Sequence, residues 1–266
     1  MRKIIVFSLI TIMLAIACYK VPVTGRRQFR MLPEGLLTGM GITAYNDFLR
    51  TNPPVPVTNA DASKVKTVGD RMSRAVDDYL LKYGYKKIKK NLNWSYELVS
   101  SPVVNAWCMP GGKIVFYSGI MPLTMNESGI AVIMGHEMAH AVARHGNERM
   151  SQQMALYMGG ISLVIALNDK PEETRNLFLA VYGVGGVLGT LAYSRKHEYE
   201  ADKIGMIFMA MAGYDPEEAI HFWERMQAYS SGPQIPQFLS THPNHQSRIV
   251  EMKKFLPKAK KYYKQQ

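Results

Sequence analysis

Cysteines and acidic residues are scarce in this sequence of 266 residues. The two cysteines, Cys18 and Cys108, are too few for a disulfide framework in a chain of this size. Lysine and arginine outnumber aspartate and glutamate by 32 to 21, and the net charge of +11 favours anionic partners without choosing among them. No segment repeats at a fixed period, which argues against a solenoid. Because 47% of the residues are hydrophobic, the chain can bury a core and is not a wholly disordered protein.

The N-terminal apolar run, residues 4–17, is short for a membrane-spanning helix, which needs about 20 residues. Two basic residues precede the run and small residues end it before Cys18, a pattern that resembles a bacterial lipoprotein signal. That signal usually has leucine where this chain has Ala15. We expect residues 1–17 to be a lipoprotein signal peptide and Cys18 to be lipidated, with a plain cleaved signal or an uncleaved anchor as alternatives.

A lipid on Cys18 would anchor the protein in the bacterial cell envelope, facing the periplasm. Tyr19 follows the cysteine where an aspartate would favour the inner membrane, so the sequence favours the outer membrane. Residues 18–56 contain several prolines and glycines and predict a lipid-anchored tether with a short helix over residues 36–49.

Residues 57–266 predict one folded domain of mostly helical α+β class with a small sheet. Apolar residues at helical spacing alternate along the chain with period-two segments and glycine-rich turns. The apolar stretches 154–167 and 178–192 are short for membrane spans and favour buried helices. Further helices are expected over residues 62–83, 126–150 and 194–211 and from about residue 243, and strands over residues 92–98, 103–109 and 113–118.

All seven histidines lie in the second half of the chain, and two of them form the pentad His136-Glu137-Met138-Ala139-His140. On a helix this spacing places both imidazoles on one face, as a single Zn²⁺ requires of two nitrogen ligands. Glu137 is then placed to take a proton from a water that the metal acidifies. The pentad therefore predicts a site for one zinc ion per chain, with Glu137 as general base.

A hydrolytic zinc also needs a third protein ligand. His145 stands one place short of the metzincin pattern. Glu198 is the better candidate, and Asp202, four residues later on the same helix face, would orient a zinc-binding imidazole. Glu200 is expected to be exposed or salt-bridged, and His197 is a weaker alternative ligand.

Five motif blocks follow one another in order between Trp94 and Phe255. The blocks are Asn105-Ala106-Trp107 with Pro110-Gly111-Gly112, His136-Glu137-x-x-His140, Ser194-Arg195 with Glu198-x-x-x-Asp202, Ala212-Gly213-Tyr214-Asp215-Pro216, and Thr241-His242-Pro243 with Arg248-Ile249. Together they resemble a family of gluzincin-type zinc endopeptidases that includes HtpX, the Oma-type mitochondrial protease and the CAAX prenyl endoproteases. The chain looks like an exported, lipid-anchored branch of that family.

The resemblance implies a zincin-like metallopeptidase domain over residues 57–266, with a small sheet whose edge strand faces the active-site cleft. It implies that Glu137 is the base and that His242 and Arg248 face the cleft. His242 precedes a helix start, where it would suit stabilisation of an oxyanion. The ligands that it implies are His136, His140 and Glu198.

An edge strand at residues 104–109 would bind an extended peptide by main-chain hydrogen bonds. Asn105, Ala106 and Trp107 are therefore expected to contact the substrate, and unfolded or misfolded envelope polypeptides are the expected partners. In some relatives a loop histidine is thought to cap the zinc and keep the enzyme latent, and residues 229–245 could do so here.

The function expected from the sequence is zinc-dependent endoproteolysis of envelope proteins. The alternatives are a latent protease and a non-catalytic envelope chaperone that uses the same groove. Nucleic-acid binding is not expected, because the basic charge comes without a matching motif. The sequence leaves the oligomeric state open.

Overall fold

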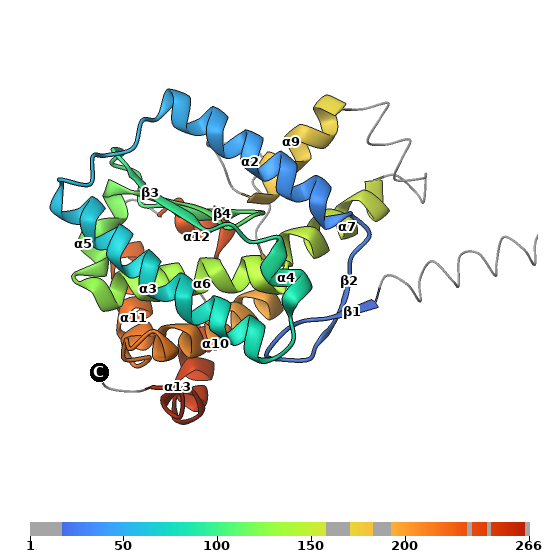
Figure 1. The fold of residues 1–266 in the computed structure, drawn as a ribbon. Coiled ribbons are helices and arrows are strands. Elements are labelled where there is room, and N and C mark those ends of the chain that lie inside the picture. The colour runs from blue at the N-terminus through green and yellow to red at the C-terminus, as the bar shows by residue number, and fades with distance from the viewer. Residues whose placement is uncertain (1–17, 158–170, 183–192, 233–235, 244–245, 264–266) are drawn as a thin grey trace, which may run out of the picture.

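Figure 1 shows a computed structural model that describes residues 18–157, 171–182, 193–232, 236–243 and 246–263. The fold is mostly helical α+β and zincin-like, as predicted. The predicted signal peptide and most of the apolar stretches 154–167 and 178–192 lie outside the described residues. The elements are β1 (Cys18–Lys20), β2 (Arg27–Phe29), α2 (Glu34–Thr51), α3 (Ala60–Lys82), α4 (Lys86–Lys90), β3 (Ser95–Val99), β4 (Ala106–Met109), β5 (Lys113–Tyr117), η1 (Ser118–Ile120), α5 (Met121–Thr124), α6 (Glu127–Ala143), α7 (His145–Tyr157), α9 (Pro171–Tyr182), α10 (Arg195–Met211), α11 (Glu218–Ser230), α12 (Phe238–Thr241) and α13 (Gln246–Lys260).

The segment 18–56, predicted to be a tether, is folded onto the rest of the domain. Strands β1 and β2 pair antiparallel, with Cys18 opposite Phe29, and helix α2 follows. Val21 and Leu37 are buried in the two cores of the domain. The helix in this segment was correctly predicted, but the reading of the segment as a free tether was wrong, because its apolar residues pack against the domain.

The central sheet has the strand order β3-β5-β4, with β3 parallel and β4 antiparallel to β5. Its two faces are covered by different helices (Figure 1). Phe116 joins the core built with α3, α6 and α10, whereas its neighbour Val115 joins the core built with α2, α7 and α9. This alternation follows from the period of two along a strand.

Strand β4 is at the edge of the sheet, as predicted, but its four residues are all buried. The indole of Trp107 packs edge-on against Phe48 of α2, with 5.1 Å between ring centroids. Asn105 and Ala106 are also buried, and Phe238 of α12 donates its backbone N–H to Val104 just before the strand. The side chain of Trp107 therefore belongs to the core, and contact of this strand with a substrate stays a prediction.

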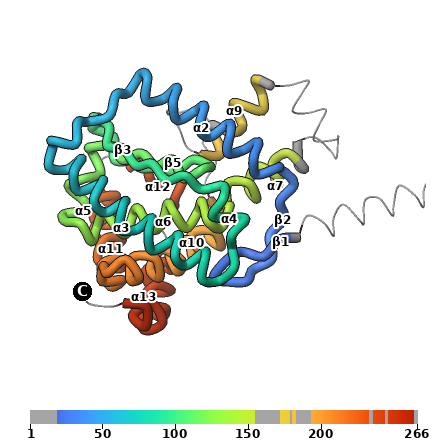
Figure 2. Tube along the Cα trace, viewed as in Figure 1, coloured from blue at the N-terminus to red at the C-terminus, as the bar shows by residue number. Residues whose placement is uncertain are grey.

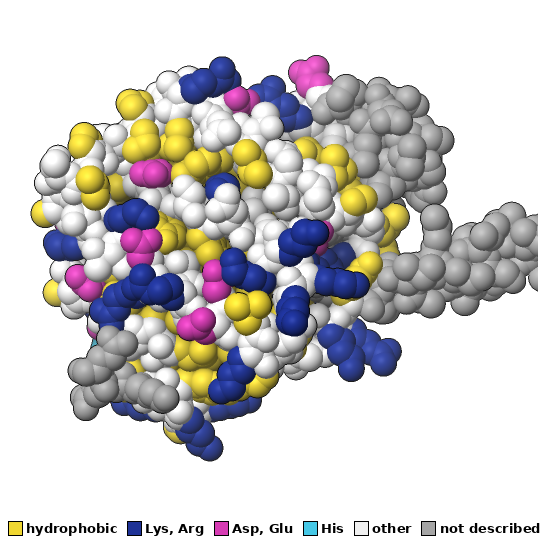
Figure 3. Space-filling view, in the orientation of Figure 1, with side chains coloured by type: hydrophobic (Ala, Val, Ile, Leu, Met, Phe, Trp, Pro, Cys, Tyr) yellow, Lys and Arg dark blue, Asp and Glu magenta, His cyan; other side chains and the backbone are white. Residues whose placement is uncertain are grey.

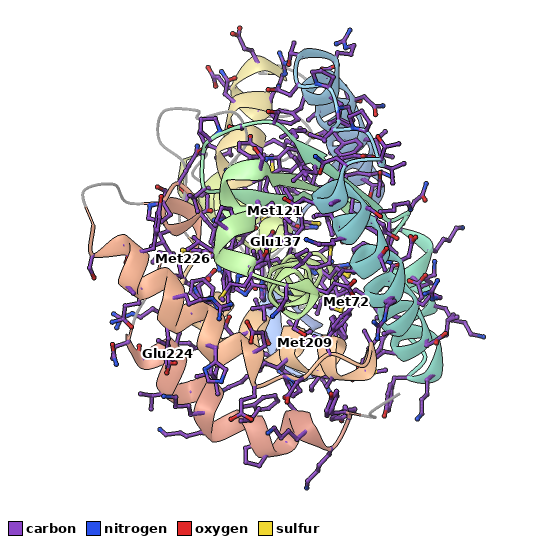
Figure 4. The ribbon with its side chains drawn as sticks, turned by 90° about the vertical axis from the view of Figure 1, so that its left-hand side faces the viewer. Met72, Met121, Glu137, Met209, Glu224 and Met226 are labelled. Carbon is purple, nitrogen blue, oxygen red and sulfur yellow. The ribbon has the colours of Figure 1, made fainter. Side chains whose placement is uncertain are left out.

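Helix α6 runs through the middle of the molecule and is surrounded by other helices. Figure 4 shows methionines from four of them, Met72, Met121, Met209 and Met226, arranged around α6. The helix was predicted to run to residue 150 without a break. It ends instead at Ala143. The next residue, Arg144, has a left-handed backbone conformation with φ of 58°, and the separate helix α7 begins after it.

Helices α6 and α10 touch at two glycines. A Cβ added to Gly205 would lie 2.9 Å from the backbone carbon of Gly135. The absence of side chains at these two positions lets the helix backbones meet, one residue before the first histidine of the pentad. The close crossing brings side chains of both helices into one small volume. None of the helices in the described part of the chain is long and apolar enough to cross a membrane.

Candidate metal centre and active site

Four buried side chains converge at the crossing of α6 and α10. His136 and His140 project from α6, Glu198 from the first turn of α10, and His242 from the end of α12. Each offers one ligand atom, and these atoms all lie within 4.8 Å of one another. The four-residue spacing of the α6 histidines and the close approach of the two helices produce this convergence.

The distances within the cluster fit a tetrahedral ion. The Nε2 atoms of His136 and His140 are 3.0 Å apart, and each is 3.4 Å from an oxygen of Glu198. Nitrogen ligands about 2.0 to 2.1 Å from a tetrahedral zinc stand roughly 3.3 Å apart. Three imidazoles and one carboxylate are also the ligand types that zinc takes. The described residues therefore suit a zinc ion.

Asp202 and Arg248 hold the first imidazole and the carboxylate of the cluster. Asp202 accepts a hydrogen bond from Nδ1 of His136 at 3.0 Å, which leaves Nε2 of that ring for a metal. Arg248 donates to both oxygens of Asp202, at 2.6 and 2.8 Å, and pairs with Glu198 at 2.8 Å. Burial alone would raise the pKa of Glu198, but Arg248 keeps it well below the usual range.

Arg248 was expected to face the cleft, and the structure contradicts this. The side chain is fully buried, and its guanidinium lies 3.7 Å from the ring centroid of Trp223. Both carboxylates that it contacts belong to α10. Arg248 is therefore placed to position Glu198 and Asp202 rather than to contact a substrate.

His140 is held by a chain of side chains that sequence reasoning missed. Its Nδ1 lies 2.9 Å from Nδ1 of His145, whose Nε2 lies 2.9 Å from Glu200. The ring of Tyr193 lies 4.0 Å from that of His140. His145 and Glu200 are buried, and Glu200 forms an ion pair with Arg26 at 2.7 Å, so of the two expectations for Glu200 the salt bridge is confirmed and the exposure is wrong. The only sequence signal was His145 itself, which falls just after the pentad.

His197, the weaker alternative ligand, is not in the cluster. Its Nε2 lies 3.1 Å from Glu148, and its ring stacks on that of His145. Consecutive residues of a helix point about 100° apart, so His197 and Glu198 face different neighbours. The third ligand position is left to Glu198.

Glu137 lies beside the cluster and is 2% exposed. Burial raises the pKa of this carboxyl to about 8, although the neighbouring His136 acts in the opposite direction. A base in a hydrolytic reaction works best with a pKa near the operating pH. Environment and position both suit Glu137 to exchange protons next to a metal.

His242 lies inside the ligand cluster rather than across a cleft from it. Its Nδ1 is 3.1 Å from Nε2 of His136 and 3.2 Å from Glu198, and its Nε2 is 3.4 Å from Glu137. In this position the imidazole occupies the direction from which a fourth ligand would approach. The structure therefore places His242 among the candidate metal ligands, and its predicted role towards an oxyanion stays a prediction. His245 lies outside the described residues.

A small cavity lies beside the end of β4 and meets the cluster at His140. Its lining includes Cys108 and Met109 of the strand together with His140 and Tyr193. The end of the strand, rather than its middle, is thus the part of β4 nearest an open path to the metal ligands.

Comparison with known proteins agrees with this site. The profile of Peptidase family M48 matches residues 66–256. The mitochondrial metalloendopeptidase OMA1 of Saccharomyces cerevisiae is 32% identical over 261 residues, which is 92% of this chain and 71% of that protein. Human OMA1 is also 32% identical, but over 64% of this chain and 34% of its own length.

A bacterial relative is similar over a large part of the chain. The putative beta-barrel assembly-enhancing protease of Vibrio cholerae is 28% identical over 78% of this chain and 42% of its own length. The chain thus spans most of the yeast relative but less than half of the human and Vibrio ones. The profile match covers the whole ligand cluster, and the chain belongs to peptidase family M48, the metalloendopeptidases to which the predicted HtpX- and Oma-type resemblance pointed.

Proposed function

We propose that this protein is a zinc-dependent endopeptidase that hydrolyses peptide bonds of unfolded or misfolded polypeptides. The observation that carries the proposal is the convergence of His136, His140 and Glu198 beside the buried carboxyl of Glu137. One zinc ion per chain would be held by these three ligands. When bound there, zinc lowers the pKa of water and polarises a peptide carbonyl, so that water can attack at neutral pH.

Glu137 moves the proton in this scheme. Its carboxylate takes the proton as the oxygen of water forms a bond to the carbonyl carbon. It then gives the proton to the amide nitrogen as the carbon–nitrogen bond breaks. Burial raises the pKa of this carboxyl, and the positive charge of a bound metal would lower it again and favour the carboxylate that acts as a base. Asp202 and Arg248 keep His136 and Glu198 in position through both steps.

The substrate class follows from access to the site. The cavity beside Met109 and His140 is small and admits no folded domain, and a polypeptide that reaches the ligands would have to enter as an extended chain that widens it. The name of the Vibrio relative refers to β-barrel assembly and supports substrates in a bacterial envelope.

We also propose that lipidated Cys18 anchors the enzyme in the outer membrane, facing the periplasm. On the face shown in Figure 3, basic side chains lie among acidic and apolar ones.

The proposal predicts metal-dependent cleavage by the purified full chain. We expect about one zinc per chain, cleavage of unfolded casein, and loss of both after treatment with a strong chelator. Added Zn²⁺ should restore the activity, and a stably folded protein offered in parallel should remain intact. Casein fragments are followed by electrophoresis, and metal is measured on the same sample. Cleavage that survives complete removal of the metal would refute the proposal.

A second candidate, a latent form of the same enzyme, is favoured by the position of His242. As a fourth ligand the imidazole would block the place that water must take, and its contact with Glu137 would occupy the base. We therefore expect His242→Ala to bind zinc and to cleave casein at least about tenfold faster than the unmodified chain, because the place for water and the base would both be free. A tenfold increase corresponds to about 1.4 kcal/mol in the activation free energy. Zinc content and initial rates test this. A rate that falls instead would assign His242 to catalysis.

A further inference from the structure

The N-terminal segment reaches the back of the metal site through one arginine. In Figure 2 strands β1 and β2 lie side by side at the edge of the molecule, with β2 next to α7. Arg26 on the loop between the two strands donates through Nη1 and Nη2 to both oxygens of Glu148, at 2.9 and 2.6 Å. Its Nε donates to Glu200 at 2.7 Å. Arg26 thereby joins helices α7 and α10 from a segment more than 100 residues away.

Glu200 is held on both of its oxygens. Arg26 binds Oε2, and the hydroxyl of Thr24 donates to Oε1. Gln28 on β2 donates to the carbonyl oxygen of Ala143 at 2.7 Å, which ties the same segment to the end of α6. The N-terminal segment thus grips the carboxylate and the two helices around it.

From Glu200 the hydrogen bonds run in one direction to the metal ligand. A neutral His140 that offers the Nε2 lone pair to a metal carries its proton on Nδ1. That proton is donated to Nδ1 of His145, so His145 carries its own proton on Nε2 and donates it to Glu200. A fixed carboxylate at the far end of the chain therefore selects the tautomer of His140 that can bind a metal.

We propose that Arg26 is a positioning residue of the metal site, acting on His140 through Glu200 and His145. This inference rests on the proposed zinc site and adds the N-terminal segment to it. Partners beyond the direct ligands set the orientation and tautomer of metal-binding histidines, and their loss typically weakens metal binding about 10- to 100-fold. Without Arg26, the only contact holding Glu200 from the N-terminal segment would be that of Thr24 with Oε1. The carboxylate at the end of the imidazole chain would then be less firmly fixed.

The test is the zinc affinity of full-length variants, measured by competition with a chelator of known affinity. We expect Arg26→Gln and Glu200→Gln each to weaken binding about 10- to 100-fold. Arg26→Lys should recover part of the affinity because it keeps one charged donor. Arg27→Ala, an exposed neighbour in the same segment, is the matched control and should bind as the unmodified chain does.

Two further readouts separate positioning from a general loss of stability. The visible absorption of the Co²⁺-loaded protein reports ligand geometry and should change in Arg26→Gln but not in Arg27→Ala. In addition, Arg26→Gln should weaken binding no further in a His145→Gln background, since the path is already cut there.

Equal zinc affinity and an unchanged Co²⁺ spectrum in folded Arg26→Gln would overturn the inference. If Arg26→Gln does not fold, the same two measurements on Glu200→Gln decide it. A failure of the unmodified chain to bind any zinc would count against the proposed zinc site instead, so the two failures are distinguishable.

Discussion

Glu137→Gln should lower kcat/KM for peptide cleavage by about 10²- to 10⁴-fold, the usual contribution of a general base. The amide keeps the size of the side chain but takes no proton from water. None of the four ligand atoms is removed, so zinc binding should persist. Casein cleavage and zinc content measured on one preparation test both statements.

The matched control is Glu127→Gln, the same change at the other end of α6. Glu127 is the first residue of that helix, more than two turns before His136, with a partly exposed side chain outside the ligand cluster. The kcat/KM of this variant should stay within about twofold of the unmodified value. Full cleavage by Glu137→Gln would mean that another group takes the proton. If Glu137→Gln lost zinc as well as activity, the cleavage rate would be divided by the zinc content. A rate per bound zinc equal to that of the unmodified chain would contradict the role of Glu137 as base.

Arg248→Met should lower the free energy of unfolding by about 3 to 5 kcal/mol, the range found when one partner of a buried ion pair is removed. The change leaves Glu198 and Asp202 buried with no guanidinium between them. Urea unfolding of the chelator-treated proteins measures the effect. With zinc present the loss should be smaller, because the ion supplies positive charge to Glu198.

The effect of Arg248→Met should also depend on pH in a defined direction. Burial alone would raise the pKa of Asp202, but the charge of Arg248 outweighs burial and lowers this pKa below its ordinary 3.8. A carboxyl with a lowered pKa in the folded state adds stability above its ordinary pKa and loses it as the pH falls. The difference between the two proteins should therefore be full at pH 7 and shrink below about pH 4.

The control for this variant is Lys253→Met on the same helix. Lys253 pairs with Glu224 at the surface, where both side chains are more than 40% exposed, and such pairs contribute about 0 to 1 kcal/mol. A loss below 1 kcal/mol in Arg248→Met would contradict the role assigned to this arginine.

The sequence allowed the cluster to be predicted because its parts obey local rules. His136 and His140 share a helix face by their spacing, and Glu198 and Asp202 do so on a second helix. The sheet was predicted from period-two alternation, and β3 and β5 lie close to the expected ranges. Each of these patterns is set by residues two to four positions apart in the sequence.

What could not be predicted depends on contacts between distant segments. Arg26 meets Glu200 across 174 positions, and no local pattern marks either residue for the other. Trp107 was predicted from its edge strand alone, and no sequence pattern indicated that the side chain packs against helix α2. The break at Arg144 also lacks a signal, since arginine has no preference for a left-handed conformation.

If Cys18 carries the proposed lipid, its pairing with Phe29 would limit how far the metal site can move from the membrane. A free tether of residues 18–56 would let the domain search a radius of about 35 Å around its attachment point. The β1–β2 ribbon removes that freedom, because residues 18–29 are already part of the domain. With a lipid on Cys18 the cavity would stand at one height and one angle above the bilayer. Substrates would then be selected by the distance of their unfolded segments from the membrane surface, as well as by their sequence.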